Sequence, residues 1–417
     1  MAKFSATPQL VVDLVATKDD GSREVMEIHE GDILEDIVYS EGGATYTKTG
    51  KISAILVATD KVTPDYKQDA CKMESSFHKA VKVEAIVLDS SSKYDSDANL
   101  IMVKNIKSIA SVTAGVMEVD ASVMEAGGVA ALLDGLTPGQ NLKLETGTVS
   151  EALVMNQSVT IQGVNAGVSA AKGYRCSATV ENETVFNGSL TVGEGAQVVL
   201  DGLTLTENAQ IATNGAADIK LVNCRILGVK ETEGKREGIL KSASWDDEVT
   251  LDVQGCYFGD NAGMYNLFES NCTLQSNSIV KDCYFSENSY GNNAINLYKV
   301  ADGAYINIVG NVFENSKNAV RVACKGAVDC VVNITNNTYY KTSDVPEYAG
   351  LVLIQPYGKA TTDMSGVTVN ISGTKNESGL EQVVYYYTGS NDSQFTASQM
   401  PKVFVDGVQV VFPASVE

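Results

Sequence analysis

The densest group of acidic side chains is Asp246-Asp247-Glu248, which directly follows the single tryptophan, Trp245. Two neighbouring carboxylates can act as acid and base on a glycosidic bond, and aromatic rings beside them give a sugar ring a flat surface for stacking. Tyr257 and Tyr284 occupy equivalent places in two copies of a repeated motif, and we expect both to point outward. The simpler interpretation of these residues is a solvated loop beside two exposed tyrosines. The alternative interpretation is a glycan site. The glycan site would comprise Trp245, Asp246, Asp247, Tyr257 and Tyr284.

Histidine is confined to the beginning of the chain, at His29 and His78. The remaining sequence therefore lacks imidazole as a general base or metal ligand. This excludes Ser-His-Asp triads, Cys–His pairs and histidine zinc sites from most of the chain. We expect no catalytic residues, no metal and no other cofactor. A glycan lyase or hydrolase that works without imidazole stays an alternative.

The eight cysteines have neither a disulfide framework nor a metal-binding spacing. No two form a C-x-x-C pair, and eight thiols in 417 residues are too sparse for a disulfide scaffold. We therefore expect free, mostly buried thiols and a reducing compartment. The cysteines are Cys71, Cys176, Cys224, Cys256, Cys272, Cys283, Cys324 and Cys330.

The charge balance restricts the partners. With 31 basic and 52 acidic side chains the formal charge is -21, so the chain would repel a phosphate backbone, and nucleic-acid binding is not expected. A hydrophobic content of 44% is typical of a globular protein. No apolar run reaches the ~18 residues of a membrane helix, and the first residues lack the apolar core of a signal peptide. We expect no membrane contact and synthesis in a cytoplasm.

Residues 1–118 are predicted to form a small β domain, either a barrel or a sandwich. Residues 33–39 and 44–50 alternate apolar and polar side chains around a Gly-Gly turn, which is the pattern of a hairpin. A second strand pair is expected at residues 81–88 and 101–109. The domain is therefore predicted to be antiparallel at least in its hairpin.

Residues 142–377 repeat a short motif in which an apolar strand precedes Gly, Cys or Asn, then a polar and a large apolar residue. From Cys224 to Asn337 the motif recurs at spacings of 32, 27, 28 and 26 residues, which indicates a solenoid with one structural turn per repeat. The strands are rich in β-branched and aromatic residues, and no amphipathic helix recurs. This predicts an all-β protein whose larger domain is a right-handed parallel β-helix. The motif occupies residues 159–164, 199–205, 221–226, 253–258, 280–285, 308–313 and 334–339.

Alternation along these strands assigns their faces. Residues two positions apart in a strand point to the same side. If the phenylalanines face the core, the residues two positions before them face the core as well. Cysteines and asparagines at equivalent places then stack as a ladder, and the asparagine of an F-x-x-N motif suits a tight corner. A reactive or metal-binding cysteine row is the alternative, but no basic cluster lies beside it. The predicted ladder residues are Cys224, Cys256, Cys283, Asn311, Asn337, Phe258, Phe285, Phe313, Asn261 and Asn288.

This repeat region resembles the pectin-lyase-like right-handed β-helix proteins. Residues 142–149, which lead to residues 159–163, are similar to their first turn, and the Asn-Cys-x-Phe style of motif is also similar. The resemblance implies the fold and no single activity. Polygalacturonase-like members imply an aspartate triad with a histidine that is absent here, and pectate-lyase-like members imply a calcium-binding aspartate cluster with an arginine base. The basic residues that do not sit in such a motif are Arg225, Lys241, Arg321 and Lys325.

A small β domain before a β-helix, in an acidic chain, resembles bacteriophage virion proteins such as head fibres, capsid decoration proteins and tail spikes. The resemblance implies a structural protein of the virion surface, made in the host cytoplasm, that docks on capsid or other virion proteins through residues 1–118. It would display the β-helix outward as a homotrimer and adhere to glycans. Two alternatives stay open: a tail spike that binds or cleaves bacterial polysaccharide, and a β-helix protein of a bacterial cell.

The two ends of a β-helix are open edges that need covering. Residues 119–141 contain a short helical segment at 123–135 and are predicted to be a linker and cap. Residues 378–417 are predicted to handle the other end, because residues 403–411 alternate around Asp406-Gly407, a strong hairpin signal. This hairpin either caps the last turn or pairs with neighbouring subunits.

Overall fold

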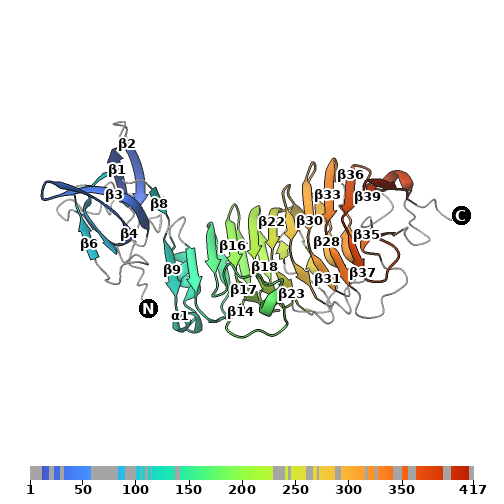
Figure 1. Cartoon of the computed structure of the whole chain (residues 1–417), viewed down its shortest axis with the longest axis horizontal. Coiled ribbons are helices and arrows are strands. Elements are labelled where there is room, and N and C mark those ends of the chain that lie inside the picture. The colour runs from blue at the N-terminus through green and yellow to red at the C-terminus, as the bar shows by residue number, and fades with distance from the viewer. Residues whose placement is uncertain are drawn as a thin grey trace, which may run out of the picture. The chain divides into compact units, whose positions relative to one another are not determined.

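The structure is a computed structural model in which the chain divides into two compact units (Figure 1). Unit 1 comprises Met1–Met117 and Gly135–Leu142, and unit 2 comprises Glu118–Asp134 and Lys143–Glu417. The described residues are 12–17, 23–28, 32–57, 83–89, 100–104, 106–108, 111–113, 115–136, 141–228, 240–242, 246–259, 266–269, 272–286, 293–314, 318–324, 327–340, 350–355, 363–387 and 396–412.

Unit 1 is built from antiparallel strands. The strands are β1 (Val12–Thr17), β2 (Arg23–Ile28), β3 (Ile33–Glu41), β4 (Ala44–Val57), β5 (Val83–Asp89), β6 (Leu100–Val103), β7 (Ile106–Ser108) and β8 (Ser111–Thr113). One sheet runs in the order β6-β5-β4-β3-β7, with β8 also paired to β3, while β1 pairs with β2. Its buried side chains include Leu34, Ile37, Ile52, Ile86 and Val103.

The hairpin predicted at residues 33–50 is confirmed. Glu41 lies opposite Ala44, so Gly42 and Gly43 alone form the loop between β3 and β4. Both glycines have positive φ, +60° and +85°, as a type I′ turn requires, and this turn matches the twist of the paired strands. The second predicted pair is also confirmed, because β5 pairs antiparallel with β6.

Unit 2 is a parallel β-helix, as the repeat predicts, and the chain as a whole is all-β. Each turn contributes a strand to each of three faces, and strands pair in parallel with their counterparts one turn later, as Val159 pairs with Val198 and Val198 with Ile219. These three side chains are buried, and so are their counterparts in later turns. Stacking therefore buries one continuous apolar core that no single turn could form alone.

The strands of face 1 are β9 (Val116–Val119), β10 (Asn141–Leu144), β13 (Val159–Gln162), β16 (Gln197–Asp201), β19 (Ala217–Val222), β22 (Glu248–Gln254), β25 (Thr273–Leu274), β26 (Ile279–Lys281), β29 (Lys299–Val300), β30 (Tyr305–Val309), β33 (Cys330–Thr335), β36 (Val367–Ser372), β39 (Lys402–Val405) and β40 (Val408–Val410). The strands of face 2 are β11 (Gly147–Val149), β14 (Thr184–Phe186), β17 (Leu203–Leu205), β20 (Arg225–Ile226), β23 (Tyr257–Phe258), β27 (Tyr284–Phe285), β31 (Val312–Glu314), β34 (Thr338–Tyr340) and β37 (Lys375–Glu377). The strands of face 3 are β12 (Leu153–Met155), β15 (Leu190–Gly193), β18 (Ile211–Asn214), β21 (Leu240–Ser242), β24 (Asn266–Glu269), β28 (Asn293–Leu297), β32 (Asn318–Val322), β35 (Val352–Ile354) and β38 (Val384–Tyr386). On face 3 the pairing is interrupted between β21 and β24, so this face consists of two sheets.

Two short helices, rather than the single one predicted, begin unit 2. They are α1 (Ala121–Glu125) and α2 (Val129–Asp134), and β9 (Val116–Val119) precedes them. The Asp120 carboxylate caps α1 by accepting the Val123 N–H at 3.0 Å. The Glu151 carboxylate accepts the Val129 N–H at the start of α2 at 2.7 Å. Because α1 contacts β11 and α2 contacts β12, the helices cover the first turn of the β-helix.

The predicted C-terminal hairpin is present on the last turn of face 1. The strand β39 pairs in parallel with β36 on one side and antiparallel with β40 on the other. Val405 lies opposite Val408, and the loop residues Asp406 and Gly407 both have positive φ, +47° and +80°. The Asp-Gly pair therefore forms the same type of turn as Gly42-Gly43 in unit 1.

Aromatic rings stack along the interior of face 2. The ring centroids of Phe258 and Phe285 are 4.4 Å apart, those of Phe285 and Phe313 are 4.9 Å apart, and those of Phe313 and Tyr339 are 5.3 Å apart. All four side chains are buried, which confirms that the three phenylalanines face the core. Tyr339 continues their stack, but its buried hydroxyl has no hydrogen-bond partner.

Replacing Tyr339 by phenylalanine is expected to stabilise the protein by about 1–2 kcal/mol, because a buried hydroxyl without a partner costs roughly that much. The same burial raises the pKa of the Tyr339 phenol well above its usual value. Denaturant unfolding measures the change in the free energy of unfolding. The control is Tyr340→Phe on the exposed neighbouring tyrosine, which should change little. A less stable Tyr339→Phe variant would contradict the prediction.

Candidate functional site

The described members of the predicted glycan site lie at opposite ends of one strand. Asp246 and Asp247 immediately precede β22, whereas Tyr257 follows the corner at the far end of that strand. The seven residues of β22 separate the two places by about 23 Å. Trp245 lies outside the described residues. The acidic pair and the tyrosines therefore do not share one surface.

Asp246 is paired with a lysine of a later turn. Its Oδ1 accepts a hydrogen bond from Lys299 Nζ at 2.5 Å, and the carboxylate is exposed to solvent. The lysine holds the pKa of Asp246 below its usual value. A general acid for glycoside cleavage needs the opposite, a carboxyl group whose pKa is raised. The environment of Asp246 is that of a solvated surface ion pair.

Tyr257 and Tyr284 stack on each other outside the core, with ring centroids 6.0 Å apart. The expectation that both are exposed is wrong for Tyr257, whose side chain is only 4% accessible. Tyr284 is half-buried, and its hydroxyl donates to Glu314 Oε2 at 2.8 Å. The two rings thus belong to a covered part of face 2.

The predicted cysteine and asparagine ladder is present at the corner between face 1 and face 2. Its five side chains are buried, and the residue before each has left-handed backbone, with φ between +53° and +69°. Only glycine adopts this backbone freely, and asparagine and aspartate tolerate it. The ladder residues are Cys224, Cys256, Cys283, Asn311 and Asn337. The corner residues before them are Asn223, Gly255, Asp282, Gly310 and Asn336.

Each ladder asparagine bonds to the backbone of the turn before it. Asn311 Oδ1 accepts the Cys283 N–H at 2.9 Å, and its Nδ2 donates to the Val280 carbonyl at 2.9 Å. Asn337 repeats this one turn later, with the Asn311 N–H at 2.8 Å and the Ile308 carbonyl at 3.0 Å. The side chains therefore satisfy the N–H groups that the corner removes from the strand ladder, and they donate in addition to a carbonyl of the strand before the corner.

The ladder cysteines make a weaker version of the same contacts. Cys256 Sγ accepts the Cys224 N–H at 3.4 Å, and the Cys224 thiol donates to the Leu200 carbonyl at 3.3 Å. Burial raises the pKa of both thiols well above the usual value, so they remain protonated and serve as packing groups. The seven described cysteines are free thiols. Predicted residues that lie outside the described ranges are Cys71, Asn261 and Asn288.

A segment that connects β13 to β14 lies along the outside of face 2 (Figure 1); we call residues 163–183 the strap. The Gly167 N–H donates to Asp201 Oδ1 at 3.1 Å, and the Ala170 N–H donates to the Gly255 carbonyl at 2.9 Å. The strap includes the short helix η2 (Gly173–Arg175). Because Asp201 and Gly255 belong to different turns, the strap ties turns of the β-helix together.

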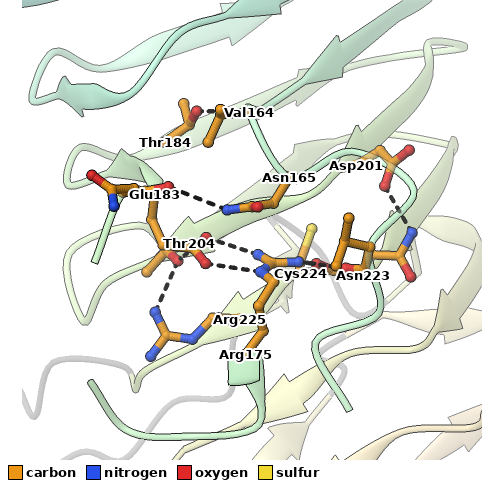
Figure 2. A network of polar contacts seen from close by, with 12 residues as sticks. Val164, Asn165, Arg175, Glu183, Thr184, Asp201, Thr204, Asn223, Cys224 and Arg225 are labelled. Carbon is orange, nitrogen blue, oxygen red and sulfur yellow. Dashed lines mark hydrogen bonds and ion pairs between the residues drawn. The ribbon is translucent and has the colours of Figure 1, made fainter. Parts of the chain in front are cut away.

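Two residues of the strap, Arg175 and Glu183, form a buried bidentate ion pair (Figure 2). Arg175 Nε donates to Glu183 Oε1 and Arg175 Nη2 to Glu183 Oε2, both at 2.8 Å. Arg175 Nη1 donates to the carbonyls of Val168 and Asn223, both at 2.6 Å. The two side chains are 0% and 2% exposed, so this ion pair is shielded from water.

Thr204 and Arg225 extend this network across face 2 (Figure 2). The Thr204 hydroxyl donates to Glu183 Oε2 at 3.0 Å and accepts from Arg225 Nη1 at 3.2 Å. Arg225 Nη2 donates to the carbonyls of Ser177 and Ala178 at 2.6 and 2.9 Å, while its Nε has no partner. Burial lowers the pKa of the Arg225 guanidinium from its usual value.

The buried network consists of two guanidinium groups, one carboxylate and one hydroxyl, so it carries net positive charge inside an acidic chain. Its groups hold the strap against face 2, and among them there is neither an activated nucleophile nor a carboxylate pair. Sequence reasoning missed it. The available signal is the interval of 39 residues from Gly163 to Gly202, which is longer than the spacings of 22 to 32 residues between Gly202 and Asn337.

Cys176, on the strap, is expected to be alkylated at higher pH than a free cysteine. Partial burial raises its thiol pKa, and the carboxylate of Glu314 raises it further. Glu314→Gln removes that charge, so the midpoint pH of alkylation should fall and the rate at neutral pH should rise. Peptide-resolved mass spectrometry after timed alkylation measures both, with buried Cys256 as the thiol that stays unlabelled. An unchanged midpoint would contradict the proximity of strap and Glu314.

Comparison with known proteins finds no family model that matches the chain and no matching curated protein. Within the described ranges, no three His, Cys, Asp or Glu side chains gather as a metal ion would require. None of the helices in the described part of the chain is long and apolar enough to cross a membrane.

Proposed function

We propose that the chain is a structural protein on the outer surface of a bacteriophage particle, attached through residues 1–118 and presenting the β-helix to the surroundings. The proposal rests on one observation: the buried polar groups of the corner ladder and the strap network in unit 2 form hydrogen bonds with other groups of the same chain. These hydrogen bonds stabilise the stack. An arrangement of this kind supports a scaffold that must persist outside a cell.

Resistance to unfolding follows from the way turns are joined. Face 2 alone contains nine strands, and an interior strand hydrogen-bonds to the turn before it and to the turn after it. Opening one turn therefore breaks contacts in both neighbours, so local opening is unfavourable in the middle of the stack. The net charge of -21 supports a place away from the packaged nucleic acid.

The proposal is tested on purified phage particles from the source host. Quantitative mass spectrometry should find the chain at a fixed copy number relative to the major capsid protein. An antibody against unit 2 should label the particle exterior in electron micrographs. Absence of the chain from particles banded in a density gradient would overturn the proposal.

Adhesion to glycans without cleavage is part of the proposal. Incubation with surface polysaccharide of the host should therefore release no new sugar ends. Cleavage that Asp246→Ala or Asp247→Ala abolishes would instead favour a depolymerising tail spike. Asp246→Ala is a fair test because the carboxylate is exposed, and an exposed ion pair contributes only about 0–1 kcal/mol to stability.

A further inference from the structure

The β-helix ends with three edge strands, one on each face, and they differ in how they are protected. The edge of face 2 is β37, where Lys375 and Glu377 form an exposed ion pair at 2.7 Å. The edge of face 3 is β38, whose residues Val384–Tyr386 are all half-buried. The edge of face 1 is β40, which is exposed at Val408 and Gln409 and carries no charge. Charged side chains are a common defence of an edge strand, and β40 lacks them.

The free side of β40 presents backbone groups to solvent. Val405 and Val408 close a two-residue loop and so form a hydrogen-bonded pair, which makes the next pair, Phe404 and Gln409, a non-hydrogen-bonded one. The N–H and carbonyl of Gln409 therefore point away from β39, and by alternation those of Val411 do so as well. Among the described residues no hydrogen bond engages these groups.

The strand is held firmly on its other side. Besides its pairing with β39, the Val410 carbonyl accepts a hydrogen bond from the Tyr386 hydroxyl at 3.4 Å. The rings of Tyr386 and Phe412 meet edge-on with centroids 5.3 Å apart. Burial raises the pKa of Tyr386 to about 12, so the hydroxyl keeps the proton that it donates. A strand fixed in this way needs little ordering before it pairs with another.

The exposed side chains around β40 are apolar and uncharged. Val408 is 70% exposed and Val411 is 81% exposed, the two highest values among the large hydrophobic residues that are exposed. Residues 407–416 contain no charged side chain in a chain whose formal charge is -21. Two copies of the chain carry the same negative charge and repel each other. The repulsion is weakest where the uncharged segment of one copy contacts the same segment of the other.

We propose that β40 is an interface at which two copies of the chain pair antiparallel, edge to edge, about an axis near Val410. Gln409 of one copy would then lie opposite Val411 of the other, and the free N–H and carbonyl groups of both residues would be satisfied reciprocally. The interface is isologous, because one segment is its own complement. Each β40 has one free edge, so pairing closes at two copies and not at the three expected from the sequence. The inference does not depend on the proposed function.

The test uses the full chain and three variants in analytical ultracentrifugation. Wild type should sediment as a dimer that dissociates on dilution. Val411→Lys and Gln409→Lys place a charge on the paired edge and should each raise the dissociation constant by at least about tenfold. The matched control is Val328→Lys, because Val328 is a 53% exposed valine in a turn of the same unit, and this variant should dimerise like wild type.

Hydrogen exchange of single amides provides the second readout. In the wild-type dimer the amides of Gln409 and Val411 should exchange slowly, and in Val411→Lys the Gln409 amide should exchange rapidly while the β39 amides stay protected. Protected β39 amides also show that the variant hairpin is folded. A wild-type monomer at all concentrations, a trimer, or a dimer that both edge variants leave intact would each overturn the proposal.

Discussion

Glu183→Gln is expected to lower the free energy of unfolding by about 3–5 kcal/mol, which is the typical effect of removing one partner from a buried ion pair. The substitution leaves the guanidinium groups of Arg175 and Arg225 buried without a counter-charge, and the Thr204 hydroxyl loses a charged acceptor. Equilibrium denaturant unfolding measures the loss. The strap should loosen first, since Glu183 links it to Thr204 of face 2.

The matched control for this prediction is Glu118→Gln, which breaks an exposed ion pair of unit 2. Glu118 lies 3.2 Å from Lys143, and the two side chains are 76% and 56% exposed. An exposed ion pair contributes about 0–1 kcal/mol, so the control should lose little. Replacing the buried pair together, as Arg175→Met with Glu183→Leu, should recover part of the loss because no unpaired Arg175 charge remains. Equal losses for Glu183→Gln and Glu118→Gln would contradict a structural role of the network.

Asn311→Ala is expected to destabilise unit 2 by about 1–3 kcal/mol, because a buried backbone group left without a partner, here the Cys283 N–H, costs roughly that much. The change removes the acceptor of the Cys283 N–H and the donor to the Val280 carbonyl. The Cys283 N–H lies at the buried corner, where water cannot replace the amide, while the Val280 carbonyl belongs to β26 and its strand ladder. The free energy of denaturant unfolding again measures the effect.

Two variants sharpen this test. Asn333→Ala also removes an amide from a stack, since Asn333 bonds to Asn307 at 3.1 Å and to Asn370 at 3.0 Å, but this stack is half-buried on the outside of face 1. Water can satisfy its partners, so the loss should stay below about 1 kcal/mol. Asn311→Cys, which copies the residue of the preceding turns, should lose less than Asn311→Ala. If alanine at positions 311 and 333 had equal effects, the corner ladder would not be the stabilising feature.

The parallel β-helix and its corner ladder could be predicted from the sequence because their determinants are local and repeated. A left-handed corner demands Gly, Asn or Asp, as at Gly255, Asp282 and Asn336, and alternation then decides which of the following residues face the core. The hairpins at Gly42-Gly43 and Asp406-Gly407 were predictable for the same reason. Two positive φ angles in succession restrict the residue types at neighbouring positions.

The acidic and aromatic residues of the predicted glycan site do not lie together. Residues that are close in sequence can lie far apart on the surface of a β-helix. Asp247 and Tyr257 are ten positions apart, yet a full strand of face 1 and a corner lie between them. Residues in contact instead come from different turns, as Asp246 and Lys299 do at a separation of two turns and 53 positions. The repeat length predicts which strands stack, but not which surface side chains meet.

The sequence by itself determined the all-β class, the period of the stack, the inward phenylalanines and the position of the corner ladder, since each depends on backbone preferences and alternation within a few residues. Only the tertiary structure decided that Tyr257 is covered, that Arg175 and Glu183 of the strap form a buried ion pair, and that β40 is the edge strand of face 1. These features depend on where a long connection lies and on which strand is last in its sheet. Neither is encoded in any short segment, because both are set by contacts between turns that are distant in sequence.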